Sequence, residues 1–257
     1  MPGGPQPMDR AARLDLAHNL ARRLRQHYGE RVLAIGAYGS LARGTDRPYS
    51  DIELHCVLHG TQYERWLEWS AGPWKAEIDV YSQELLLARA AQVDGDWPIS
   101  HGAVTAVMAL YDPDGYFPRL KAAVFSQPDA VFRRVMRDVI VGNIYEHIGK
   151  IRNAQADGYT APLPALAVDL ARDGARLIGL DNRYLYTTNT RLWEESLSLP
   201  DRPAGYDTLV GLVMAGTLDA AAQLAGMADA FWAGVERWAA ARNLVIEEDL
   251  TGLLAAE

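Results

Sequence analysis

The stretch "IGAYGSLARGTDRPYSDIELHCVL", residues 35–58, joins a Gly-Ser turn to a predicted strand that begins with two acids. Alternate side chains of a strand share a face, so Asp51 and Glu53 point to one side of a sheet and Ile52 to the other. Two carboxylates this close repel each other unless a cation lies between them. The stretch therefore predicts a sheet-containing fold with an acidic strand face, on which a cation would offset the repulsion.

A second acidic strand is predicted at residues 74–82, "WKAEIDVYS", where apolar residues alternate with Lys75, Glu77 and Asp79. If the two strands are neighbours, four acids cluster on one face of the sheet. Hard divalent cations such as Mg2+ prefer oxygen ligands and usually also bind substrate phosphates. An alternating acidic strand by itself is more often a face wetted by solvent, so the neighbouring sequence decides the interpretation.

The Gly39-Ser40 pair supplies that context. A strand that ends in Gly-Ser and leads into a helix offers backbone N–H groups and a hydroxyl to a phosphate. Arg43 follows one helical turn later. The pair alone is a weak signal, but the order strand, Gly-Ser, short spacer, Asp-x-Glu and second acidic strand favours a site for a nucleotide and a metal ion.

Composition limits the classes of partner. The formal net charge of −8 argues against binding nucleic acid by phosphate neutralisation and fits cationic small molecules better. Cys56 is the only cysteine, so no intramolecular disulfide is possible and we expect a reducing, cytoplasmic location. No apolar run approaches the roughly 20 residues of a membrane span, so no membrane partner is expected. Residues 1–10 are rich in Pro and Gly and predict a loose tail.

The hydrophobic pattern changes near residue 125. Before it, the sequence predicts a helix at 9–27 and strands at 31–39, 51–58 and 74–82, with a weaker strand signal at 103–112. After it, amphipathic helices are predicted as one long helix over 131–154 and further helices at 164–180, 207–225 and 226–242. We therefore expect an α+β protein with a mixed-sheet domain at 1–125 and a helical bundle at 126–257.

The ordered motifs resemble those of the nucleotidyltransferase superfamily that includes polymerase beta. The resemblance is closest to the kanamycin nucleotidyltransferases, the aminoglycoside 4'-O-nucleotidyltransferase family. It continues through "EWSAGPWKAEIDVYSQELLL", "VDGDWPISHG", "YEHIGKIRNA", "ARLIGLDNRYLYTT" and "RPAGYDTLV", from about residue 30 to about residue 240. It implies a metal- and nucleotide-binding domain at 1–125 and a helical domain at 126–257 that carries the catalytic base.

The resemblance implies roles for the acids of the first domain. Asp51 and Glu53 would ligate Mg2+, and Glu77 would be the third acid of the site and also contact the antibiotic. Glu68 would lie near the antibiotic as well. The family has an amide where Asp79 stands, so no metal role is transferred to Asp79.

The resemblance also implies a nucleotide site and a base. Ser40 and Arg43 would hold the nucleoside triphosphate, together with Lys150 and Thr188. Glu146 would be the general base and would also contact the antibiotic. Without the resemblance, Glu146 and Lys150 read as an ordinary i,i+4 surface pair worth about 0.3–0.5 kcal/mol.

One position departs from the family pattern. The family has an additional acid one turn before the base, where this chain has Gly142 followed by Asn143. Since that acid lines the drug site in the kanamycin nucleotidyltransferases, the range of antibiotics accepted by this chain is the property most affected.

The activity implied by the resemblance is Mg2+-dependent transfer of AMP from ATP to the 4'-hydroxyl of aminoglycosides such as kanamycin and tobramycin. Pyrophosphate is released and resistance results. The family also implies a homodimer with shared active sites, although the sequence is equally compatible with a site inside one chain. The alternatives are a nucleotidyltransferase for another acceptor and a non-catalytic, antitoxin-like partner-binding protein. The clustered acids argue against the latter.

Overall fold

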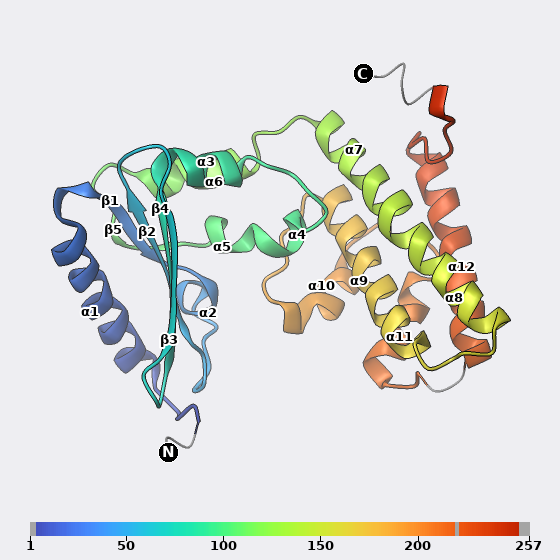
Figure 1. The fold of residues 1–257 in the computed structure, drawn as a ribbon, viewed down its shortest axis with the longest axis horizontal. Coiled ribbons are helices and arrows are strands. Elements are labelled where there is room, and N and C mark those ends of the chain that lie inside the picture. Colours follow the sequence, from blue (N-terminus) through green and yellow to red (C-terminus); the bar gives the residue numbers. More distant parts are fainter. Residues whose placement is uncertain (1–3, 219–220, 252–257) are drawn as a thin grey trace. The chain divides into compact units, whose positions relative to one another are not determined.

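The structure is a computed structural model that describes residues 4–218 and 221–251. The chain forms two compact units, one of Met1–Gln92 with Ser100–Gln127 and one of Val93–Ile99 with Pro128–Glu257 (Figure 1). The segment Val93–Ile99 belongs to the second unit, so the units are not separated by a single point in the sequence.

The first unit is built on a mixed sheet of five strands in the order β3-β4-β2-β1-β5. The strands are β1 (Val32–Ala37), β2 (Ile52–Leu58), β3 (Glu64–Ser70), β4 (Lys75–Ser82) and β5 (Met108–Tyr111). Strands β2 and β4 are parallel, and the other neighbouring pairs are antiparallel. The helices of this unit and of the connection to the second are α1 (Arg10–Tyr28), α2 (Gly39–Arg43), α3 (Gln83–Ala90), α4 (Trp97–Ser100), α5 (Gly102–Thr105) and α6 (Tyr116–Val124).

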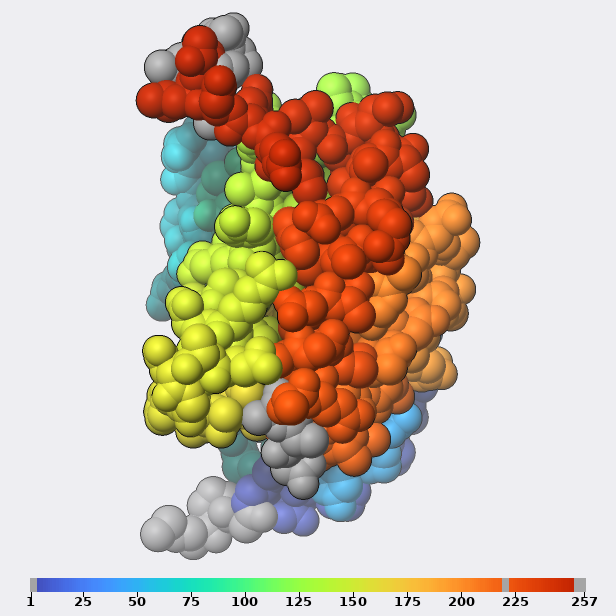
Figure 2. Space-filling model, turned by 90° about the vertical axis from the view of Figure 1, so that its right-hand side faces the viewer, coloured from blue at the N-terminus to red at the C-terminus, as the bar shows by residue number. Residues whose placement is uncertain are grey.

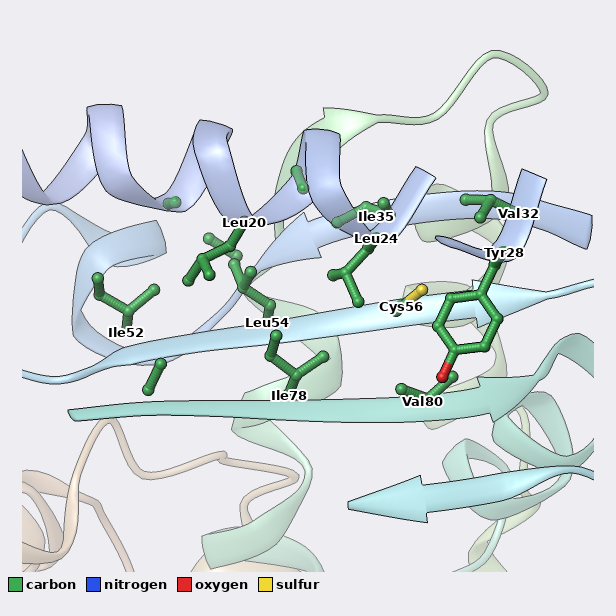
Figure 3. Close-up of a cluster of buried hydrophobic side chains, with 14 of the residues drawn as sticks. Leu20, Leu24, Tyr28, Val32, Ile35, Ile52, Leu54, Cys56, Ile78 and Val80 are labelled. Atoms are coloured by element: carbon green, nitrogen blue, oxygen red, sulfur yellow. The ribbon is translucent and has the colours of Figure 1, made fainter. Parts of the chain in front are cut away.

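Helix α1 covers the apolar face of the sheet, as its leucine spacing predicted. Asp9 caps its first turn by accepting a hydrogen bond of 2.8 Å from the Ala12 amide. Leu20 and Leu24 of α1 are buried in the same cluster as Leu54 of β2 (Figure 3). Because strand side chains alternate, this packing turns the acidic residues of β2 and β4 to the opposite face.

Two strand predictions differ from the structure. Strand β3 was not predicted, because its sequence "ERWLEWS" lacks a regular apolar alternation and an edge strand need bury neither face fully. The weak signal at 103–112 resolves into helix α5 and the shorter strand β5. The N-terminal tail is held in part, since the amide of Gln6 donates to the Pro73 carbonyl at 2.8 Å.

The second unit is a helical bundle, as predicted, and the α+β fold class is confirmed. Its helices are α7 (Asp129–Val139), α8 (Tyr145–Ala156), α9 (Leu163–Asp181), α10 (Leu192–Ser198), α11 (Tyr206–Ala215) and α12 (Ala221–Ala241). Figure 2 shows α8 and α12 side by side on one face of this unit. Within the described ranges, no helix combines the length and apolar character required to cross a membrane.

The long helix predicted over 131–154 is interrupted. A π-helical turn, Ile140–Ile144, separates α7 from α8. The helix predicted over 207–225 ends at Ala215, where Gly216 caps it at a φ of 68°. The prediction's residues 219–220 lie outside the described residues.

Candidate active site

Three acids form a row across the polar face of the sheet. The strand register places Glu53 of β2 opposite Glu77 of β4, and Glu77 opposite Glu68 of β3. Asp51 immediately precedes β2. The structure thus brings together four acids, Asp51, Glu53, Glu68 and Glu77, which we call the acid row. The strand pattern had predicted a cluster of Asp51, Glu53, Glu77 and Asp79, and Glu68 joins the row through the unpredicted strand β3.

Lys75 lies among these acids. Its Nζ is 2.6 Å from a Glu68 oxygen, 3.6 Å from Glu77 and 3.9 Å from Asp51. The hydrogen bond to Glu68 raises the pKa of Lys75 above its ordinary value. A positive charge at this position offsets the repulsion among the carboxylates, which identifies the acid row as a cation-attracting surface.

Glu53 is largely buried between other acids of the row. Burial, followed by the charges of Asp51 and Glu77, raises the pKa of Glu53 to about 7, although Arg43 opposes the shift. Glu53 therefore holds its proton more tightly than an ordinary glutamate does. A cation bound between Asp51 and Glu53 would return Glu53 to its ionised form.

Gly39 allows the turn to approach the acid row. Its φ is 64°, a conformation that favours glycine, and a Cβ at this position would overlap the Glu53 carboxylate. The backbone also connects the two segments, because the Tyr38 amide donates to the Glu53 carbonyl at 3.0 Å. Helix α2 thus begins beside Glu53 and carries Ser40 and Arg43, and the Arg43 Nε is buried without a hydrogen-bond partner among the described residues.

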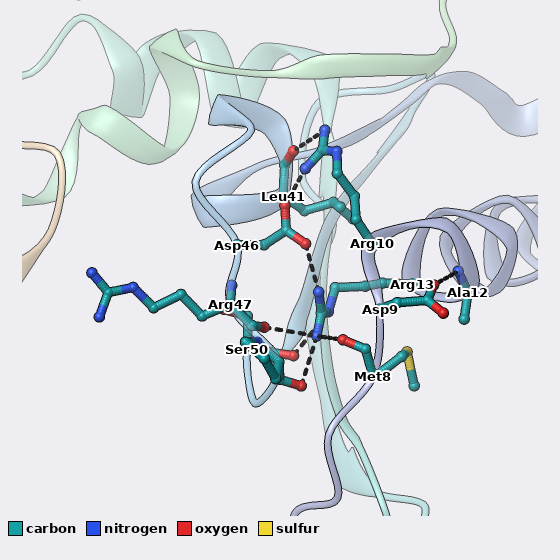
Figure 4. A network of polar contacts seen from close by, with 10 residues as sticks. Met8, Asp9, Arg10, Ala12, Arg13, Leu41, Asp46, Arg47 and Ser50 are labelled. Atoms are coloured by element: carbon teal, nitrogen blue, oxygen red, sulfur yellow. Dashed lines mark hydrogen bonds and ion pairs between the residues drawn. The ribbon is translucent and has the colours of Figure 1, made fainter.

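The loop that leads from α2 to Asp51 is held by Arg13 of α1. Arg13 is 1% exposed and pairs with Asp46. Its guanidinium also donates to the Arg47 carbonyl at 2.9 Å and to the Ser50 carbonyl at 3.1 Å (Figure 4). Because Ser50 directly precedes Asp51, the buried guanidinium fixes where β2 and its first acid begin.

Asp79 is turned toward a different set of partners. Its Oδ2 accepts a hydrogen bond of 3.0 Å from the Tyr38 hydroxyl, and the Tyr38 ring stacks on His55 with centroids 4.1 Å apart. Burial raises the pKa of Asp79 and lowers that of His55 to about 4, so His55 is neutral. Its Nε2 lies 3.1 Å from the Ala103 carbonyl and is therefore the protonated ring nitrogen. These contacts give Asp79 a role in holding Tyr38, next to Gly39.

The remaining predicted residues belong to the second unit. Glu146 and Lys150 form an i,i+4 pair at 2.6 Å on α8, with the Glu146 side chain 60% exposed. Lys150 lowers the pKa of Glu146 by hydrogen bonding and by its charge. Thr188 precedes a short 3-10 helix, and its Oγ1 lies 2.8 Å from that of Thr190. Gly142 lies in the π-helical turn.

The donor set of the acid row fits Mg2+. Among the described residues no group of three or more His, Cys, Asp and Glu side chains forms a metal site. Mg2+ does not require such a group, because it is usually bound by one or two carboxylates together with waters and substrate phosphates. Asp51 and Glu53 supply two hard oxygen donors, and the position of Lys75 shows that a cation is favoured beside them.

Comparison with known proteins assigns the family. Residues 114–245 match the KNTase C-terminal domain family. Two aminoglycoside nucleotidyltransferases (4'), from Staphylococcus aureus and Bacillus sp., are each 38% identical to this chain over 244 residues, covering 95% of this chain and 96% of theirs. The chain belongs to the aminoglycoside nucleotidyltransferase (4') family. The family resemblance inferred from the sequence is confirmed.

A solved structure agrees on the fold. A nucleotidyltransferase-like protein from Exiguobacterium sibiricum superposes with a TM-score of 0.53 over 88% of this chain and 75% of that protein. The two sequences are 14% identical, so this likeness concerns the fold alone.

Sequence reasoning did not identify three contributors to this arrangement. Lys75 was visible in the alternating strand, but its contact with Glu68 depends on the unpredicted strand β3. Tyr38 and Arg13 carried no local signal, since a tyrosine after a strand and an arginine in an amphipathic helix are common. The Asp-x-Glu pattern and the Gly-Ser turn were the signals that located the site.

Proposed function

We propose that this protein transfers AMP from ATP to the 4'-hydroxyl of aminoglycoside antibiotics in an Mg2+-dependent reaction that releases pyrophosphate and confers resistance. The observation that carries the proposal is the acid row beside the Gly39-Ser40 turn, in a chain of the aminoglycoside nucleotidyltransferase (4') family. Such a transfer depends on positioning and on charge neutralisation more than on covalent chemistry.

The nucleotide is assigned to polar and cationic side chains. Ser40 and Arg43 follow Gly39 on α2 and would bind the triphosphate, with Lys150 and Thr188 contributing from the second unit. The buried Arg43 Nε, which has no hydrogen-bond partner among the described residues, supports a role for Arg43 in binding an anion. Negative charge builds up on the pyrophosphate as it leaves, and cationic side chains around the triphosphate would stabilise that charge.

Asp51 and Glu53 would hold Mg2+, which supplies charge neutralisation at the phosphates. The raised pKa of Glu53 supports this assignment, because a carboxylate in this setting gains a counter-charge when a cation binds. Glu77, directly opposite Glu53 in the register, adds negative charge to the same face.

Glu146 would accept the proton of the attacking hydroxyl. Lys150 lowers the pKa of Glu146 by hydrogen bonding and by its charge, which favours the ionised form required of a base. General bases of this kind contribute about 10²–10⁴-fold to rate. The acids Glu68, Glu77 and Glu146 would also bind the ammonium groups of the antibiotic, and the net charge of −8 favours approach of a polycation.

In this proposal the protein is a cytoplasmic homodimer, and residues of both subunits contribute to each active site. Light scattering of the purified protein gives the oligomeric state. Mixing an Asp51→Asn chain with a Glu146→Gln chain tests sharing, because activity above that of either variant alone requires residues from two subunits in one site.

The activity is tested by incubating the protein with ATP, Mg2+ and tobramycin and measuring product mass. Kanamycin and tobramycin should be modified, whereas gentamicin, which lacks the 4'-hydroxyl, should not. Glu146→Gln should reduce turnover about 10²-fold or more, with ATP binding changed only a few-fold. Retention of more than half the turnover would rule out Glu146 as the base, and equal modification of gentamicin would rule out the 4' position.

A further inference from the structure

Asp173 is a buried carboxylate in the middle of α9, with 1% of its surface exposed. A buried charge is strongly unfavourable unless it is paired and hydrogen-bonded. The Oδ1 accepts hydrogen bonds from Arg176 Nη1 at 2.7 Å and from Asn143 Nδ2 at 3.2 Å. The Oδ2 lies 2.9 Å from His147 Nδ1, close enough for an ion pair although not aligned as a hydrogen bond. Two of the three partners therefore come from the π-helical turn and the first turn of α8.

These two partners lie on either side of Glu146 in the sequence. Asn143 belongs to the π-helical turn and His147 to the first turn of α8. Residues about one helical turn apart lie on the same side of a helix, so Asn143 and His147 both face Asp173. The turn of helix that carries Glu146 is thus attached to α9 at both of its ends.

The π-helical turn determines which way α8 faces. Each residue of an α-helix turns the chain by about 100°, and a π-turn contains one residue more than an α-turn. If Ile140–Ile144 were α-helical, every side chain of α8 would be rotated by about 100° relative to α7. Helix α7 cannot rotate to compensate, because Phe132 and Met136 are buried in the core. The direction of Glu146 therefore depends on the π-turn being kept.

Apolar packing holds one side of this turn, where Ile140 and Ile144 are buried. A Cβ at Gly142 would meet no described atom within 4 Å, so the middle of the turn is not enclosed by its neighbours. The hydrogen bond from Asn143 to Asp173 connects the turn to the core. Arg176, which shares the carboxylate, also pairs with Asp96, so Asp173 is itself held in place.

We propose that Asp173 is a positioning residue for the transfer reaction. By binding Asn143 and His147, it fixes the polar side of the π-turn, alongside the packing of Ile140 and Ile144, and so helps to set the direction in which Glu146 projects from α8. This inference rests on the proposed function, in which Glu146 is the base. The Asp173 carboxylate would act through Asn143 and His147, which lie on either side of Glu146 in the sequence.

The test compares Asp173→Asn with Asp181→Asn. Asp181 lies on the same helix and pairs with Arg242 at 2.9 Å, so its variant also loses an ion pair of α9 but leaves the π-turn untouched. Steady-state kinetics with ATP and tobramycin and hydrogen exchange of the peptide 140–147 are measured on both. Asp173→Asn should lower kcat about 10- to 100-fold with a smaller change in KM for ATP, and should accelerate exchange in that peptide. Asp181→Asn should do neither.

A double variant separates positioning from a general loss of structure. If Asp173 acts through Glu146, the combination Asp173→Asn with Glu146→Gln should be about as slow as Glu146→Gln alone, because the two losses share one cause. If Asp173→Asn does not fold, Asn143→Ala is used instead, because it removes one contact to the carboxylate. It should lower kcat and accelerate exchange in the peptide 140–147 in the same way, but by smaller factors.

The outcomes that overturn the inference are specific. A kcat of Asp173→Asn within about 2-fold of that of Asp181→Asn, unchanged exchange at 140–147, or multiplicative losses in the double variant would each refute it. Full turnover in Glu146→Gln would refute the base assignment and this inference with it. A slow Glu146→Gln beside a fast Asp173→Asn would refute the inference alone.

Discussion

Replacing Glu53 by glutamine should stabilise the metal-free protein at neutral and alkaline pH. Burial and the charges of Asp51 and Glu77 raise the pKa of Glu53 from 4.5 to about 7. The folded protein therefore binds this proton more tightly than the unfolded chain, and the contribution of Glu53 to the free energy of unfolding falls as pH rises from about 4.5 to about 7. At 1.36 kcal/mol per pKa unit the loss is on the order of 3 kcal/mol. Glutamine carries no charge and does not suffer this loss.

The measurement is urea unfolding of the wild type and Glu53→Gln in EDTA at pH 5 and pH 8. The variant should be more stable than the wild type at pH 8 by up to about 3 kcal/mol, and the gap should become small at pH 5. Mg2+ should stabilise the wild type more than the variant, because it restores a counter-charge to Glu53. Glu84→Gln, in the exposed first turn of α3, is the control and should show no pH-dependent gap. An equal gap at both pH values for Glu53→Gln would refute the reasoning.

Further predictions concern the turn, the loop and the metal ligand. Gly39→Ala should abolish turnover, because its methyl group would occupy the space of the Glu53 carboxylate. Gly44→Ala is the control, since Gly44 also has a positive φ but no described atom lies within 4 Å of its Cβ. It should lower the free energy of unfolding in urea by only about 1 kcal/mol. Arg13→Met should lower the free energy of unfolding by about 3 kcal/mol, because buried Asp46 keeps only Arg10 as a partner and the Arg47 and Ser50 carbonyls lose a hydrogen bond from the guanidinium. The exposed Arg22→Met on the same helix should stay within about 0.5 kcal/mol. Asp51→Asn should eliminate transfer of label from ATP yet leave the circular dichroism spectrum unchanged, and near-normal turnover would contradict its role as a metal ligand.

Much of this protein follows from local patterns in its sequence. The leucine spacing of α1 and the alternation in β2 and β4 each reflect the period of one element, which neighbouring residues express without reference to the rest of the chain. The same alternation placed Asp51 and Glu53 on one face, and the order of motifs identified the family. The sequence also indicated the helical bundle, because each amphipathic segment must bury its apolar side.

Other features were decided only by contacts between segments distant in the sequence. Glu68 and Lys75 meet because the edge strand β3 pairs with β4, and nothing in the local pattern of β3 marks it as a strand.

Tertiary contacts likewise decide where the main chain departs from regular geometry. Gly39 is required because Glu53, fourteen residues later, lies against it once β1 and β2 pair. The π-turn occurs within a segment whose apolar spacing predicted one continuous helix, and its Asn143 is bound by Asp173 of another helix. Helical and strand periods are properties of a short segment, whereas register, close approach and helix phase depend on which segments pack together, and that is determined only when the whole unit folds.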